Sequence, residues 1–97
     1  MRDDVAANLS IVLSELESAS TALAARGAVT RLRWRVENGP VDELEAVAQS
    51  ALDVSDGICW TALAAGHTGV FLVAAVAARR LFEFCENAQL LETAQRR

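Results

Sequence analysis

The residues best suited to nucleophilic or metal chemistry are one histidine and two cysteines. His67 lies in an uncharged stretch, and no aspartate or glutamate occurs within ten positions of it. A Ser-His-Asp triad could be assembled only around this residue, so we favour a core histidine with one hydrogen-bond partner. Cys59 and Cys85 are 26 positions apart, which is not a C-x-x-C spacing, and with His67 they form no zinc motif.

The carboxylates and glycines give no stronger sign of catalysis. Glu83 and Glu86 lie three positions apart, but the Glu-x-x-His pattern of di-iron bundles is absent. The stretch from Gly66 to Gly69 is too short for a phosphate-binding loop and lacks its lysine. The sequence therefore predicts no enzyme activity and no cofactor. A non-enzymatic interaction or assembly protein is the leading function, and a carrier of apolar ligands built around His67 is an alternative.

The central segment, residues 58–78, contains 21 residues without an acidic or basic side chain and is followed by Arg79 and Arg80. Its length suits a membrane span, so a small single-span membrane protein is a second alternative. However, most of its apolar residues are alanines, and His67 and Thr68 stand at its midpoint, where polar groups are costly in lipid. We therefore favour a helix that is buried in protein.

A helix that is apolar on all sides must be covered on all sides, and a 97-residue chain has few other segments to cover it. We therefore expect a homodimer or higher oligomer centred on this segment, with another helical protein as the alternative partner. Its small residues would permit a close approach of two copies. The predicted interface consists of Ile58, Ala62, Ala65, Gly66, Gly69, Leu72, Val73 and Val76.

Apolar spacing predicts helices throughout the rest of the chain. A heptad seam supports a helix over about 3–37, with a kink or change of register at Gly27. Asn38-Gly39-Pro40 predicts a turn at 38–40 and hence a helical hairpin. A second helix is expected over about 41–54 and a long helix over about 58–95. Between them we expect a break near 55–57, or else a second subunit that lies alongside one longer helix. Residues 1–97 are thus expected to form a single all-α domain, a helical hairpin plus a long C-terminal helix, that packs as an oligomeric helical bundle. The seam residues before the turn are Val5, Leu9, Val12, Leu16, Ala19 and Leu23, followed after Gly27 by Val29, Leu32 and Val36. After the turn, Val41, Leu44, Ala48 and Ala51 form a further seam.

The charges are divided into blocks. The net charge is -4, residues 26–35 carry four arginines and no acid, and residues 37–56 carry six acids and no base. A hairpin would place the two blocks face to face, with Arg35 near Asp42 or Glu43 and Arg26 near Asp53. This pattern gives no case for nucleic-acid binding. The two unpaired cysteines and the absence of an apolar leader predict a cytoplasmic protein.

A hairpin of this size with a tryptophan near its turn resembles the WXG100 proteins of type VII secretion. Here Trp34 precedes the turn, and Phe82 and Glu86 stand at the spacing of the aromatic-to-acid signal of that family. The resemblance covers the overall layout, since the glycine that defines the family does not follow Trp34 and phenylalanine replaces the usual tyrosine. It implies a secreted helical hairpin as a further alternative function.

Overall fold

The computed structural model describes the backbone of residues 2–20 and 23–96 and the side chains of residues 5–20, 23–40 and 42–87. Within these ranges it contains no strand, and the prediction of an all-α fold is confirmed. The elements are the helices α1 (Arg2–Ala19) and α2 (Leu23–Asn38), a short 3₁₀ helix (Val41–Glu43), and the helices α3 (Leu44–Ala65) and α4 (Thr68–Arg96).

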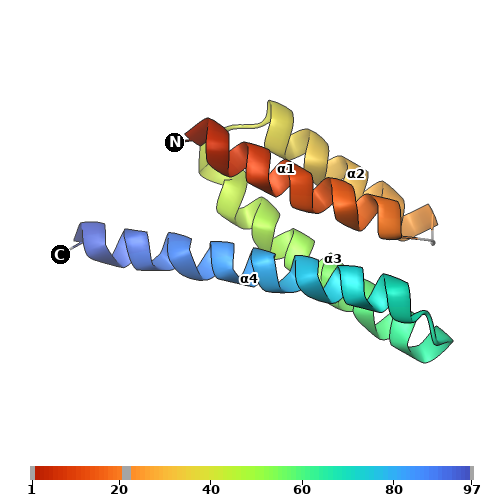
Figure 1. The fold of residues 1–97 in the computed structure, drawn as a ribbon. Coiled ribbons are helices and arrows are strands. Elements are labelled where there is room, and N and C mark those ends of the chain that lie inside the picture. Colours follow the sequence, from red (N-terminus) through yellow and green to blue (C-terminus); the bar gives the residue numbers. More distant parts are fainter. Residues whose placement is uncertain (1, 21–22, 97) are drawn as a thin grey trace.

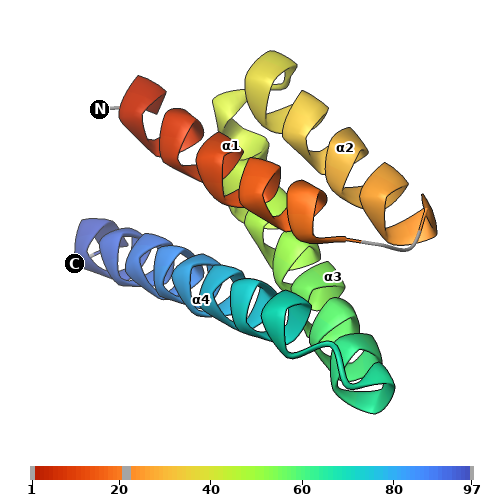
Figure 2. The ribbon, with the colours of Figure 1, turned by 45° about the vertical axis from the view of Figure 1, so that its right-hand side comes forward.

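The described helices form two antiparallel hairpins, α1–α2 and α3–α4, which lie against each other (Figure 1). Helix α1 packs against α4, and α2 packs against α3. The end of the α3–α4 hairpin near its turn points away from the α1–α2 hairpin (Figure 2). Residues 63–69 at this end are all exposed.

The core lies between the hairpins and follows the seams read from the sequence. Leu9, Val12 and Leu16 of the first seam are buried, together with Leu13. Helix α2 contributes Val29, Leu32 and Val36, and α3 contributes residues that repeat at spacings of three and four. The buried apolar residues of α3 and α4 are Leu44, Val47, Ala48, Ala51, Ile58, Ala62, Ala74, Ala77, Leu81 and Cys85.

The expected helix over 3–37 is in fact two helices. Helix α1 ends at Ala19, where the Ser20 hydroxyl donates a hydrogen bond of 2.8 Å to the Leu16 carbonyl oxygen. The seam therefore stops early, and Leu23 is 84% exposed. Gly27, where a kink was expected, lies within α2.

The predicted turn at 38–40 is confirmed. The Gly39 amide donates a hydrogen bond of 2.8 Å to the Arg35 carbonyl oxygen, and a Cβ at Gly39 would lie 2.5 Å from that oxygen. Only glycine fits this close approach. Arg35 pairs with Glu43 across the turn at 3.6 Å, as the charge blocks predicted. Among the described side chains, no ion pair joins Arg26 to Asp53.

The expected break at 55–57 is wrong, because α3 continues through these residues to Ala65. The Ser55 hydroxyl donates a hydrogen bond of 2.9 Å to the Ala51 carbonyl oxygen, so it is satisfied inside the helix and does not act as an N-cap. Ser55 is fully buried on the same face as Ala51 and Ile58. The apolar periodicity of α3 thus carries the helix across Asp56-Gly57.

The expected continuous helix over 58–95 is also wrong, because the chain reverses at Gly66. This residue has φ 74° and ψ 20°, in the left-handed region that favours glycine. The Gly66 and His67 amides donate hydrogen bonds to the Leu63 and Ala62 carbonyl oxygens at 3.2 and 2.9 Å, a Schellman-type helix end. The uncharged segment 58–78 is therefore divided between α3 and α4. Among the described helices, none is long and apolar enough to cross a membrane.

Candidate interaction surface

The eight residues predicted for an interface fall into three groups. Ile58 and Ala62 are 8% and 4% exposed and belong to the core of the chain itself, so they are removed from the predicted surface. They continue the α3 seam, whose spacing directs them inward. Ala65, Gly66 and Gly69 are exposed around the turn between α3 and α4. The remaining three, Leu72, Val73 and Val76, are exposed on α4.

Four of these residues share one face of α4. We call Gly69, Leu72, Val73 and Val76 the α4 strip; their spacing of three, one and three positions makes them neighbours on a helix surface. Leu72, Val73 and Val76 are 57%, 39% and 50% exposed. The opposite face of α4, which includes Ala74, Ala77 and Leu81, is buried in the core. The α4 strip is thus an apolar face that the described chain leaves uncovered.

A groove beside the α4 strip is lined by Val73 of α4 and by Ser14, Glu15 and Ser18 of α1. A separate hollow between the same two helices is lined by Ile11 of α1 and by residues around Arg80 of α4. The Arg80 guanidinium lies 3.5 Å from the Glu15 carboxylate and so links the two helices. Ile11 is 54% exposed, which extends the apolar character of this side of the molecule to α1.

Charged residues follow the α4 strip along the same helix. Arg79 is exposed over 82% of its side chain and pairs with Glu83 at 3.3 Å, one turn further along α4. No charged residue occurs between Gly57 and Ala78. The uncharged surface is therefore confined to the turn end of the α3–α4 hairpin.

Sequence reasoning missed the exposed apolar residues of α3. Trp60 is 72% exposed and Leu63 is 57% exposed. The signal was available, because extending the α3 seam at spacings of three and four assigns positions 55, 58 and 62 to the core. Trp60 and Leu63 fall outside that series. An interpretation of the segment as apolar on all sides does not distinguish these two residues from the core.

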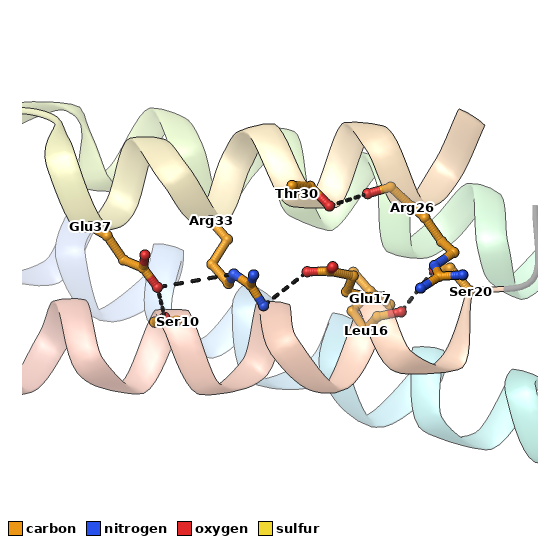
Figure 3. Close-up of polar contacts among 8 residues, drawn as sticks. All are labelled: Ser10, Leu16, Glu17, Ser20, Arg26, Thr30, Arg33 and Glu37. Atoms are coloured by element: carbon orange, nitrogen blue, oxygen red, sulfur yellow. Dashed lines mark hydrogen bonds and ion pairs between the residues drawn. The ribbon is translucent and has the colours of Figure 1, made fainter. Parts of the chain in front are cut away.

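Where α1 faces α2, polar side chains link the two helices. Arg33 lies 2.9 Å from Glu17 and 4.0 Å from Glu37, and Ser10 donates a hydrogen bond of 2.9 Å to Glu37 (Figure 3). Arg33 thus bridges acids on both helices. These contacts fix the register of the first hairpin, and each of these side chains has a structural partner.

His67, Cys59 and Cys85 differ in their exposure to solvent. His67 is exposed in the turn between α3 and α4, so the expectation of a core histidine is wrong. The pKa of the Cys59 thiol is raised, mainly by burial and to a smaller extent by the charge of Asp56. The pKa of the Cys85 thiol is also raised, mainly by burial and to a smaller extent by the charge of Glu45. Both thiols are free. Among the described side chains, no three His, Cys, Asp or Glu residues are grouped as a metal site requires.

Comparison with known protein families, with curated proteins and with solved structures found no match. The resemblance to WXG100 proteins therefore rests on layout alone. The layout also differs in the structure, because two helices and not one precede the turn at Gly39.

Proposed function

We propose that this protein is a non-enzymatic assembly module that forms a homodimer through the α4 strip. The observation that carries the proposal is the exposure of Leu72, Val73 and Val76 on one face of a helix whose opposite face is buried. Contiguous apolar surface of this kind on a small protein marks an interaction site.

The pattern of the strip favours a second copy of the chain as the partner. If two α4 helices cross antiparallel between Leu72 and Val73, Leu72 lies opposite the partner's Val73. Gly69 then lies opposite the partner's Val76. The same four residues are used twice, as a twofold interface requires.

Gly69 gives this arrangement independent support. It lies in the first turn of α4 without a positive φ, and a Cβ built on it meets nothing within 4 Å. The described structure therefore gives no reason for a glycine, a residue that loses more backbone freedom on folding than alanine does. A partner side chain as large as valine supplies a reason, because it packs as a knob into the space that glycine leaves.

The charges at the end of the strip are compatible with the same arrangement. In the antiparallel crossing, Arg79 lies near the partner's Gly66, at the C-terminal end of α3. The carbonyl groups at a helix C-terminus carry partial negative charge and favour a nearby cation. Each dimer would contain this contact twice.

The dimer is expected to dissociate into folded chains. Each chain buries its own core of leucine, valine and alanine residues, and the α4 strip lies outside that core. One pair of crossing helices buries less than the roughly 1,200 Å² of a standard stable interface, unless the groove beside it also takes part. We therefore propose a concentration-dependent dimer. The free thiols fit a reducing compartment such as the cytoplasm.

Sedimentation equilibrium of the wild-type chain and two variants tests the proposal. Leu72→Glu places a charge in the α4 strip, and Leu63→Glu places one on α3 at a leucine that is equally exposed, at 57%. The wild type and Leu63→Glu should approach twice the chain mass of 10.4 kDa as concentration rises, whereas Leu72→Glu should remain monomeric with unchanged helix content. A wild type that stays monomeric would refute the dimer. Dissociation by Leu63→Glu alone would place the interface on α3.

A further inference from the structure

A pocket of about 240 Å³ lies between the ends of the two hairpins, away from the α4 strip. Helices α2, α3 and α4 contribute to its lining together with Ser20, which follows α1, and His67, and no residue of the α4 strip does. Ser20, Ile58 and Ala62 are buried and form its floor, whereas Thr61 and His67 are exposed at its rim. Among the described residues that line it, none carries a charged side chain.

Gly57 leaves this pocket open. It lies in the middle of α3 without a positive φ, and a Cβ built on it meets nothing within 4 Å. A glycine in a helix interior destabilises the helix by about 1 kcal/mol relative to alanine, and the surrounding structure does not require it. Its effect on the molecule is to widen the pocket, and a local choice that costs stability without a structural gain is expected at functional sites.

We propose that this pocket binds a neutral, mostly apolar molecule of one aromatic ring that carries one hydrogen-bonding group. The size follows from the volume, since an apolar protein cavity of about 150 Å³ takes up benzene and this pocket is larger. The neutrality follows from the lining, because a charged group would lose its hydration without gaining an ionic partner. The hydrogen-bonding group meets the His67 imidazole at the rim, while the ring lies on Ile58 and Ala62.

Phenol and toluene are suitable probes, because they have similar size and only phenol carries a hydroxyl group. In amide-detected NMR titrations of the full chain, both should bind saturably and shift the resonances of Gly57, Thr61 and Val70. Removing one hydrogen bond is expected to reduce affinity about fivefold. His67→Leu should therefore weaken phenol binding about fivefold and leave toluene binding unchanged. An equal effect on the two probes, or none, would contradict the role of His67.

Filling the pocket provides the decisive comparison. Gly57→Leu should abolish binding of both probes and leave the chain folded, because leucine is a better helix former than glycine. Thr61→Trp fills the pocket from an exposed position and gives a second variant that does not disturb the core. Ala64→Leu places a leucine at an exposed position of α3 outside the pocket, as a control, and should bind as the wild type does. Absence of saturable binding to the wild type, or equal binding by the filled and control variants, would overturn the proposal.

Discussion

The backbone amide of His67 donates a hydrogen bond of 2.9 Å to the carbonyl oxygen of Ala62. This bond closes α3 in the middle of a segment that is uncharged over 21 residues. It converts one apolar stretch into two antiparallel helices that cover each other on one side. The remaining exposed side of α4 is the strip through which we propose that the protein dimerises.

The conformation of Gly66 predicts opposite effects of two glycine substitutions. Gly66→Ala should lower the free energy of unfolding by about 1 kcal/mol, because alanine disfavours the left-handed region. Gly57→Ala should raise it by about 0.5–1 kcal/mol, because Gly57 is helical and a Cβ there meets no atom within 4 Å. Urea titrations of the two variants beside the wild type measure both changes. Stabilisation by Gly66→Ala would contradict the geometry of the turn.

The Arg33–Glu17 ion pair should contribute more to the free energy of unfolding than the Arg35–Glu43 ion pair. Arg33→Met removes the 2.9 Å ion pair with Glu17, whose side chain is only 21% exposed, and leaves the buried Glu17 Oε2 without its cation. It should cost about 1–2 kcal/mol, because the desolvation of a buried polar group is then no longer offset. Arg35→Met removes the 3.6 Å contact to the half-exposed Glu43 and should cost less than about 1 kcal/mol. Thermal unfolding of both variants provides the comparison. An equal or larger loss for Arg35→Met would show that Arg33 does not secure the first hairpin.

The raised thiol pKa values predict a loss of stability at alkaline pH. Burial raises the pKa of Cys59 and Cys85, so the folded chain holds these protons more tightly than the unfolded chain. Their stabilising contribution is complete below the ordinary thiol value of 9.0 and is lost as pH rises through the folded pKa. The chain has no tyrosine, and its nine basic residues are all arginines, so few other groups titrate in this range.

Urea titrations between about pH 8 and about pH 11 measure this effect, since thiols ordinarily titrate there. The free energy of unfolding should fall with pH for the wild type. The double variant Cys59→Ala/Cys85→Ala should show a smaller slope, whatever its stability at neutral pH. Equal slopes for the two chains would refute the assignment.

Much of the fold could be predicted from apolar spacing and from one strong stop signal. The seams placed Leu9, Leu16, Val29 and Val36 in the core, and Asn38-Gly39-Pro40 fixed a turn, because glycine and proline restrict the backbone there. The other breaks depend on tertiary packing. Asp56-Gly57 looks like a break in isolation, but α3 is held through it because Ser55 and Ile58 pack into the core.

The candidate surface could be predicted only in part for a related reason. Of the residues predicted for the interface, Leu72, Val73 and Val76 are exposed on the chain and stay candidates, whereas Ile58 and Ala62 are buried in its core. Treating the segment as one helix made all its faces equivalent. Once Gly66 divides it, the seam of each half determines which side faces the core, and that division depends on a single glycine whose conformation the sequence does not reveal.

Disulfide trapping between two differently labelled chains tests the antiparallel α4 dimer most directly. In a Cys59→Ala/Cys85→Ala background, one chain carries Gly69→Cys and the other carries Val76→Cys, the two positions that face each other across the proposed twofold axis. Under mild oxidation the mixture should yield a cross-linked heterodimer of the two chains, and either chain alone should yield little, because identical positions lie about 10 Å apart along the helix axes, beyond the reach of a disulfide. Cross-linking of each chain with itself, or none in the mixture, would contradict the proposed dimer.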